Sequence, residues 1–362
     1  MSGSAEDLGG THMFDHDTLP QRVLFGAGRV RAHVADAVAA LGAKRILLVS
    51  AASSRALANE LAAALPVAAR IGEAAQHVPV ENAVLAVQTA RDAAADVVVA
   101  VGGGSAIGLA KIVARDTGLP IVAVPTTFSG SEATAMWGLT ENGRKITGVD
   151  PAVLPRAVVY DADLLRSLPP AFVTASAMNA MAHAVDGFWA PRADPINTAL
   201  GSEGLRALVP GLRRLAEDAG DVAAREQVLY GSYLAAAAFA SAGSGLHHKI
   251  CHALGGSFGM PHAETHAVVI AYVAAFNAPA APAAAARIED ALGSGSAGAG
   301  LWELRDSLGG PASLAELGLD EADIPRAAEI ILPAVPAGNP RPVGAADLES
   351  LLRAAWSGVR PD

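Results

Sequence analysis

Three short apolar runs, separated by alanine-rich stretches, constrain the fold of this chain more than any other feature. They are RILLV at 45–49, DVVVAV at 96–101 and IVAVP at 121–125. Strands that are apolar along their whole length are buried on both faces, which is typical of a parallel sheet with helices packed on either side. The sequence therefore predicts an α/β domain with a doubly wound parallel sheet over residues 13–163.

From about Leu164 onward the strand signal fades and long helical patterns take over. The Ala/Pro/Gly/Ser-rich stretch at 278–300 has the composition of a linker, but RIEDAL at 287–292 mixes charged and apolar residues as an amphipathic helix does. We therefore predict an all-helical domain over residues 164–362. Residues 1–12 are expected to be an expression remnant or disordered, with Met13 as the native start.

A glycine run follows the second apolar strand and directly precedes a helix. In VAVGGGSAIGLAK, the residues at this junction are Gly102, Gly103, Gly104 and Ser105. Glycines let the backbone approach a pyrophosphate, which the free amides and the helix dipole then bind. A tight strand-to-helix turn without a ligand would give the same pattern. The run is therefore weak evidence by itself.

A second polar loop, PTTFSGS, follows the next strand and contains Thr126, Thr127 and Ser131. The carboxyl ends of parallel strands share one edge of the sheet, where α/β proteins bind ligands. Two polar loops at this edge favour a dinucleotide site. The alternative is that Thr126 and Thr127 cap the next helix.

The second half gathers histidines at helical spacing. Asn179 and His183 lie four residues apart, as do His248 and His252, so each pair shares one helix face, and His262 follows. Aspartate and three histidines would form an ordinary divalent-metal site. Here the first position is an amide, which carries no charge. The histidines could instead donate protons and bind anions.

Composition excludes several classes of function. The formal net charge of -10, with no Lys/Arg stripe, argues against nucleic-acid binding. No apolar run is long enough to span a membrane, and the N-terminus has no signal-peptide pattern, so we expect a soluble protein. The single cysteine, Cys251, rules out an internal disulfide and fits a reducing compartment.

These motifs together resemble the maleylacetate reductases, a family within the iron-containing alcohol dehydrogenase superfamily. The resemblance rests on LPQRVLFGAG at 19–28, the glycine run, PTTFSGSEATAMWGLT at 125–140, NAMAHAVD at 179–186, LHHKICHALGG at 246–256 and GNPRP at 338–342. It covers nearly the whole chain, and LHHKICHALGG is its most specific part. It implies the dehydroquinate synthase-like fold of that superfamily.

The resemblance also implies an activity. Such enzymes reduce the carbon–carbon double bond of maleylacetate with NADH or NADPH, giving 3-oxoadipate in the catabolism of aromatic compounds. It implies a cytoplasmic homodimer that acts on a small dicarboxylate, with no nucleic-acid or membrane partner. Composition and spacing alone lead only to a nucleotide-dependent enzyme with a histidine-rich cleft.

Carried onto this chain, the metal ligands of the superfamily fall on Asn179, His183, His248 and His262, with asparagine in place of aspartate. We therefore favour a reaction without metal, and His183, His248 and His262 would be the ligands of any metal present. The residues expected to share catalysis are Asn179, His183, His248, His252, His262 and Lys249. Each histidine has an alternative role in packing, as do His247 and His266.

Three further residues are assigned to ligands. Lys249 and Arg341 are candidate partners of the substrate carboxylates, and Lys145 is a candidate contact of the nucleotide; each has an alternative role as a solvated surface charge. The first strand runs into Ser50 without an acid that would repel a 2′-phosphate, and Arg55 is nearby. Use of both NADH and NADPH is therefore expected.

Three alternatives remain. A metal-dependent alcohol or polyol dehydrogenase of the same superfamily would need a dication, against which Asn179 counts. A dehydroquinate synthase-like lyase would need more basic residues for a phosphate, and Lys249 is the only Lys or Arg between Gly245 and Gly259. A non-catalytic nucleotide-binding protein would have little use for so many histidines in one domain.

Overall fold

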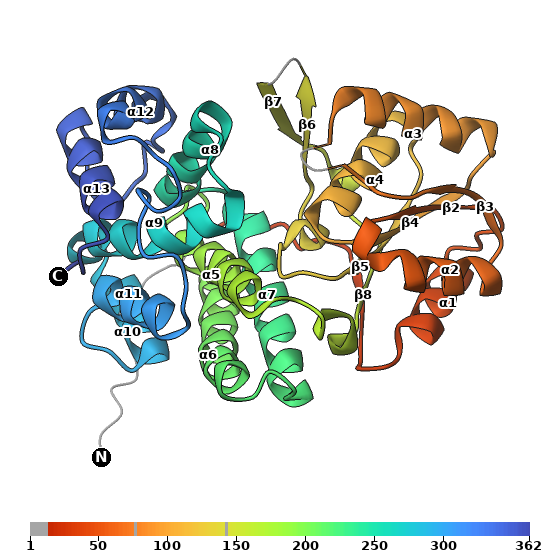
Figure 1. The fold of residues 1–362 in the computed structure, drawn as a ribbon, viewed down its shortest axis with the longest axis horizontal. Helices are drawn as coiled ribbons and strands as arrows, with labels where there is room; N and C mark the ends of the chain where they lie inside the picture. Colours follow the sequence, from red (N-terminus) through yellow and green to blue (C-terminus); the bar gives the residue numbers. More distant parts are fainter. Residues whose placement is uncertain (1–13, 76–77, 142–143) are drawn as a thin grey trace.

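The computed structural model describes residues 14–75, 78–141 and 144–362, so the expectation for residues 1–12 lies outside the described residues. Figure 1 shows a parallel sheet with its helices on one side of the molecule and a purely helical half on the other. The doubly wound α/β fold and the helical second half are thus confirmed. In the described part of the chain, no helix combines the length and the apolar character that crossing a bilayer requires.

Six parallel strands form the main sheet in the order β1-β8-β5-β4-β2-β3. Their bounds are β1 (Arg22–Phe25), β2 (Ile46–Ser50), β3 (Val67–Ile71), β4 (Val97–Gly102), β5 (Ile121–Pro125) and β8 (Ala157–Tyr160). The three strands that the apolar runs predict are β2, β4 and β5, which occupy the middle of the sheet. Every residue of these three strands is buried, because helices cover both faces.

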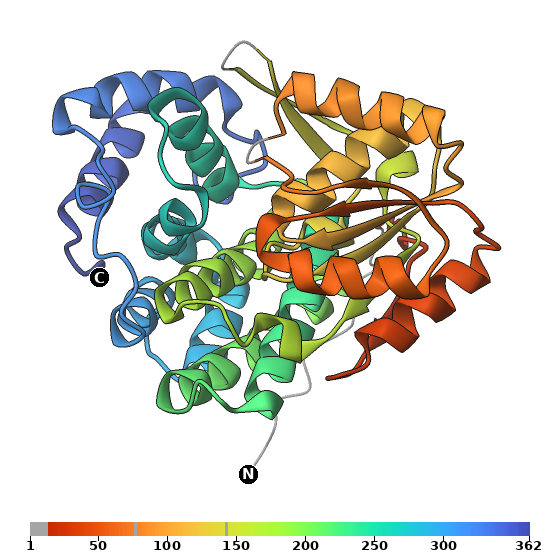
Figure 2. The same cartoon turned by 45° about the vertical axis from the view of Figure 1, so that its right-hand side comes forward.

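The four helices of this half are α1 (Val30–Ala40), α2 (Arg55–Ala64), α3 (Val80–Asp92) and α4 (Gly104–Thr117). Helices α1 and α2 pack on one face of the sheet, and α3 and α4 pack on the other. Figure 2, turned by 45°, shows the two helical layers on either side of the strands. Asp96 accepts the backbone N–H groups of Lys44 and Arg45 at 2.7 and 3.0 Å.

An antiparallel hairpin, β6 (Met136–Glu141) and β7 (Arg144–Val149), projects from this half. Lys111 on α4 holds its base, because the buried Nζ donates to Thr134 O, Thr134 Oγ1 and Met136 O at 2.8, 3.0 and 2.7 Å. Burial lowers the pKa of Lys111 to about 7, partly offset by Glu132. Lys111 thus has a structural role at the base of the hairpin.

The second half consists of α5 (Pro170–Gly187), α6 (Pro195–Glu217), α7 (Val222–Ala242), α8 (Leu246–Phe258), α9 (His262–Asn277), α10 (Pro282–Leu292), α11 (Ala297–Ser307), α12 (Ile324–Ile331) and α13 (Ala345–Ser357). Helix α5 is buried along most of its length, between α6, α7 and α9. The predicted amphipathic helix at 287–292 is the second half of α10.

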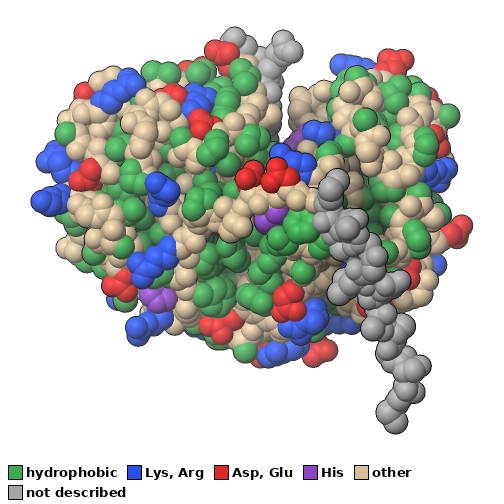
Figure 3. Space-filling model, turned by 180° about the vertical axis from the view of Figure 1, so that it is seen from behind, with side chains coloured by type: hydrophobic (Ala, Val, Ile, Leu, Met, Phe, Trp, Pro, Cys, Tyr) green, Lys and Arg blue, Asp and Glu red, His purple; other side chains and the backbone are tan. Residues whose placement is uncertain are grey.

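Viewed from behind in Figure 3, the molecule is notched between its two halves, and histidine and basic side chains lie near the notch. On this face the basic side chains are scattered among acidic and apolar ones and form no stripe.

Candidate functional site

The glycine run lies where β4 passes into α4, and steric contacts explain why it is glycine. A Cβ on Gly102, whose φ is +152°, would lie 2.8 Å from Ala106 Cβ and 2.9 Å from Ala51 Cβ. A Cβ on Gly103 would lie 2.9 Å from Thr127 Cγ2. The glycine run and the loop after β5 therefore meet at one edge of the sheet, as predicted.

The polar groups of these two loops fit a phosphate-containing ligand. Gly104 and Ser105 form the first turn of α4, whose free amides and positive dipole end attract anions. The hydroxyls of Thr127 and Ser129 are buried without a hydrogen-bond partner among the described residues. A bound ligand would satisfy both hydroxyls. Thr126 and Thr127 make no side-chain cap on the following helical turn, which begins at Ser131.

Asn179 and His183 lie on α5 and are both buried. Gly130, from the loop after β5, packs against His183, since a Cβ there would lie 2.8 Å from His183 Cε1. This contact brings the loop after β5 against the histidine cluster, which comprises His183, His248, His252 and His262. Asn179 Oδ1 and His183 Nδ1 are buried without hydrogen-bond partners among the described residues. Burial lowers the pKa of His183 to about 4, so this imidazole is neutral at pH 7.

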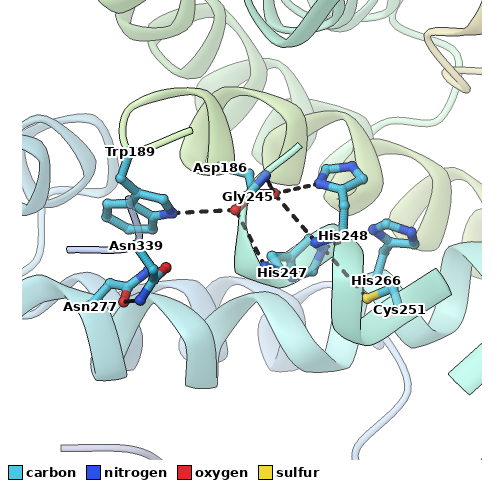
Figure 4. A network of polar contacts seen from close by, with 9 residues as sticks. All are labelled: Asp186, Trp189, Gly245, His247, His248, Cys251, His266, Asn277 and Asn339. Carbon is cyan, nitrogen blue, oxygen red and sulfur yellow. Dashed lines mark hydrogen bonds and ion pairs between the residues drawn. The ribbon is translucent and has the colours of Figure 1, made fainter. Parts of the chain in front are cut away.

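Asp186, which the sequence analysis did not single out, organises the start of α8 from a fully buried position (Figure 4). Its Oδ2 accepts from Gly245 N and His248 Nδ1, each at 2.8 Å, and from His248 N at 3.3 Å. Its Oδ1 accepts from Trp189 Nε1 at 3.3 Å and His247 N at 3.4 Å. Gly245 has to be glycine here, because a Cβ would lie 2.3 Å from Asp186 Oδ1.

Burial and the contact with Asp186 determine the protonation and the tautomer of His248. Burial lowers the pKa of His248 well below its usual value, so the ring is neutral with one proton. A carboxylate only accepts, so that proton lies on Nδ1, facing Asp186, and Nε2 keeps a free lone pair. Nε2 is buried without a hydrogen-bond partner among the described residues. His248 stacks beside His183, with ring centroids 5.2 Å apart and planes at 12°.

His252 on α8 and His262 at the start of α9 are exposed, and their rings stack with centroids 6.4 Å apart. Lys249, on the same helix as His252, is half-buried, and its charge contributes to lowering the pKa of the buried His248. The structure thus brings five of the predicted catalytic side chains into one linked group: His183, His248, Lys249, His252 and His262. Asn179 lies one turn before His183 on the same helix.

Arg341 lies apart from His262, and its role as a substrate contact stays a prediction. Its guanidinium lies over the ring of Phe276 at 4.2 Å and faces Asp347 at 3.5 Å. Phe276 is near the C-terminal end of α9, whereas His262 begins that helix, and 14 residues of helix separate the two by roughly 21 Å. Lys145 lies on β7 opposite Thr140, but its side chain is outside the described part of the chain.

A different trio gathers potential metal ligands. Among the described residues, the ligand atoms that lie within 4.8 Å of one another are those of His247, Cys251 and His266, all buried. However, His247 Nε2 and His266 Nδ1 are 2.8 Å apart, which is a hydrogen bond. Two nitrogens on one tetrahedral zinc would be roughly 3.3 Å apart. The trio could hold a metal only after that bond breaks and the Cys251 thiol, whose pKa burial raises, loses its proton.

The superfamily's metal position fits an iron or zinc ion poorly in this chain. Asn179, His183, His248 and His262 include no anionic ligand, and the nitrogens of the three histidines do not gather within 4.8 Å of one another. The charge of Asp186 is nearby, since it partly offsets the effect of burial on the pKa of His183, and Asp186 Oδ2 accepts from His248 Nδ1 at 2.8 Å. The unpartnered acceptors on Asn179, His183 and His248 equally suit the donor groups of an organic ligand.

A pocket of 300 Å³ adjoins the glycine run at the ends of β2 and β3, lined in part by Ser50, Arg55, Arg70 and Glu73. No acid follows β2, as expected, but Glu73 supplies one from the segment after β3. Its φ is +60°, and its carboxylate pairs with Arg55. Arg70 donates to Asn59 Oδ1 at 2.6 Å. Only the folded arrangement places Glu73 here.

Comparison with known proteins gives consistent results. Residues 20–162 match the iron-containing alcohol dehydrogenase family, and residues 173–356 match its C-terminal part. The chain is 43% identical to a maleylacetate reductase of Pseudomonas sp. (strain P51), over 96% of this chain and 99% of the relative. A maleylacetate reductase 2 of Cupriavidus pinatubonensis is 46% identical over 94% of this chain and 96% of the relative.

Solved structures give the same result. The crystal structure of a maleylacetate reductase from Agrobacterium tumefaciens has a TM-score of 0.93 and 41% identity, covering 97% of this chain and 100% of the other. An iron-containing alcohol dehydrogenase from Corynebacterium glutamicum has a TM-score of 0.94 and 48% identity, covering 97% and 99%.

Proposed function

Since the chain belongs to the iron-containing alcohol dehydrogenase family, in which its curated relatives are maleylacetate reductases, we propose that it reduces maleylacetate to 3-oxoadipate with NADH or NADPH. The observation that carries the proposal is the contact of Gly130 with His183. It places the loop at the cofactor edge of the sheet against the histidine cluster, so a nicotinamide bound along that loop would meet a substrate held by the histidines.

The reaction consumes one hydride and one proton. The hydride adds to the carbon β to the ketone, the electrons of the double bond move to the ketone oxygen, and the resulting enolate takes a proton at the neighbouring carbon. Neutral His248 cannot supply that proton, because its only N–H faces Asp186. His252 and His262 are the solvent-exposed imidazoles of the cluster, and we assign proton delivery to one of them. Lys249 binds a substrate carboxylate.

Isotope labelling tests this assignment. With NADH deuterated at the transferred position, deuterium should appear in 3-oxoadipate at the carbon β to the ketone, and a reaction in D2O should label the adjacent carbon. An alcohol product with deuterium on the carbon that was the ketone carbon of the substrate would contradict the proposal and favour a carbonyl reductase. His252→Asn and His262→Asn variants then identify the donor, since loss of the acid should lower kcat about 100-fold or more.

We further propose that the reaction needs no metal. The support is the amide at position 179 and the separation of the three histidines. Reduction of an enone requires stabilisation of an enolate oxygen, for which hydrogen-bond donors suffice. A family-type metal, if bound, would act as a Lewis acid on that oxygen.

For the cofactor, we propose that both NADH and NADPH are used. Arg55 and Glu73 are each about two-thirds exposed, and exposed ion pairs contribute little stability, so Glu73 can leave Arg55 to a 2′-phosphate. Arg55→Met should raise KM for NADPH about tenfold and leave KM for NADH within about twofold, whereas Glu73→Gln should lower KM for NADPH. Arg31→Met, which removes an exposed arginine outside the pocket, is the control. Equal effects of Arg55→Met on both cofactors would contradict this assignment.

A further inference from the structure

A second cavity, of 240 Å³, lies in the helical half, away from the histidine cluster. It is bounded by the segment before α5, the first turn of α5, the last turns of α6 and the end of α11. Most of its lining is apolar and includes Phe128, Leu165, Leu168, Leu212 and Leu215. Cavities of about 150 Å³ already accommodate benzene, so this one has room for a larger aromatic body.

Two basic residues, Arg166 and Arg225, line this cavity, and its other polar lining residues are Thr174 and Ser307. Arg225 is only 4% exposed; its Nη2 donates to Ala219 O, but its Nη1 is buried without a hydrogen-bond partner among the described residues. The charges of three acids, Asp163, Asp221 and Asp218, act on Arg225. Asp221 is already engaged, because it pairs with Arg214 at 2.6 Å and caps α7. A buried, unpaired cationic N–H costs free energy, which an anionic ligand would recover.

We infer that this cavity binds a small aromatic monocarboxylate, with its carboxylate on Arg225 Nη1 and Arg166 and its ring among the leucines and Phe128. The ligand differs from the catalytic substrate in kind. The substrate carries two carboxylates, whereas this cavity has two arginines and, apart from Thr174 and Ser307, apolar lining residues. An acid with one charged end and one apolar end matches that division.

Phe128 connects the cavity to the loop after β5. Its side chain lines the cavity, and its backbone N–H donates to Ser176 Oγ on α5 at 3.2 Å. Its neighbours Thr127 and Ser129 carry the unpartnered hydroxyls of the cofactor edge. A ligand packed on Phe128 therefore contacts the segment that a dinucleotide orders. By linkage, bound NADH should change the affinity for the acid.

The test uses 2-naphthoate as probe and calorimetric titration of the full-length protein, with and without NADH. We expect a Kd below about 1 mM, a change of at least threefold with NADH, and binding at least tenfold weaker for Arg225→Met and for Leu215→Trp, which fills the cavity while keeping both arginines. Arg213→Met, on α6 but outside this lining, should bind normally. Melting temperatures show whether each variant is folded.

Three results would overturn the inference. The first is no binding up to about 5 mM, and the second is equal binding by folded Leu215→Trp and wild-type protein. The third is displacement of the probe by maleylacetate, together with an unchanged affinity of Arg225→Met for the probe. The last result would place the probe in the catalytic cleft. Unchanged affinity in the presence of NADH would overturn the link through Phe128. The first two results do not depend on whether maleylacetate is the substrate.

Discussion

Replacing Asp186 by asparagine should damage catalysis more than it damages folding. The side chain accepts from five donors, and the two shortest bonds, from Gly245 N and His248 Nδ1, share one oxygen. An asparagine oxygen at that position keeps both bonds but loses the charge. Its NH2 group then faces the N–H donors of Trp189 and His247, at 3.3 and 3.4 Å.

The size of the effect follows from these bonds. Hydrogen bonds to a charged group contribute roughly 1 kcal/mol more than neutral ones, so two weakened bonds and two opposed donors cost about 2–4 kcal/mol. Removing a buried charge offsets part of this cost, because burial raises the pKa of Asp186. We expect a loss of about 1–3 kcal/mol in the free energy of unfolding. His248 also loses the charged acceptor that keeps its proton on Nδ1. A loss of transition-state stabilisation of the same size as the loss of folding stability lowers kcat about 10- to 100-fold.

The assay is denaturant unfolding together with kcat and KM for maleylacetate. Asp194→Asn is the matched control, because Asp194 is a buried aspartate that caps α6 and binds His16 but touches none of the cleft histidines. It should lose stability with kcat unchanged. If Asp186→Asn keeps kcat within about twofold of wild type, or if Asp194→Asn loses as much activity, the positioning role of Asp186 is refuted.

Three other predictions follow from separate features. Gly130→Ala should lower kcat at least tenfold by displacing His183, whereas Gly42→Ala, also at positive φ but with nothing within 4 Å, should lose only stability; equal kinetics for the two variants would contradict this. The pKa of Lys111 is about 7 in the folded protein and about 10.5 in the unfolded chain, so between these values the unfolded state binds more protons. The free energy of unfolding should therefore rise between pH 7.5 and 9.5, by at most about 1.4 kcal/mol per pH unit. Lys111→Met should flatten that slope in denaturant titrations, and an unchanged slope would contradict the assignment. Asn179→Asp should retain about one equivalent of zinc or iron after dialysis, measured by mass spectrometry, where the wild type retains less; equal contents would remove the argument from position 179.

The sequence predicted those parts of the fold that depend on local chemistry. The apolar runs identify β2, β4 and β5 because a fully buried strand needs apolar residues on both faces. The four-residue spacing of the histidines predicts shared helix faces, because residues four apart lie about one helical turn from each other. Strands β1, β3 and β8 were not predicted, because they are short or half-exposed and carry a weaker pattern.

The missed residues depend on contacts between distant segments. Asp186 follows Asn179 and His183 on one stripe of α5, so a signal was present, but its partners Gly245 and His248 are about 60 residues away. Glu73 reaches the cofactor pocket from the segment after β3. Likewise, no local pattern shows that Arg341 packs at the end of α9 that is remote from His262.

Hydride transfer to maleylacetate within a histidine cleft that needs no metal can be measured directly. The measurement is NADH oxidation with enzymatically generated maleylacetate, comparing protein treated with a chelator and protein resupplied with iron or zinc. We expect equal turnover in both samples, with 3-oxoadipate formed in step with NADH loss. Turnover that appears only after metal is restored, or activity confined to simple alcohols, would contradict it.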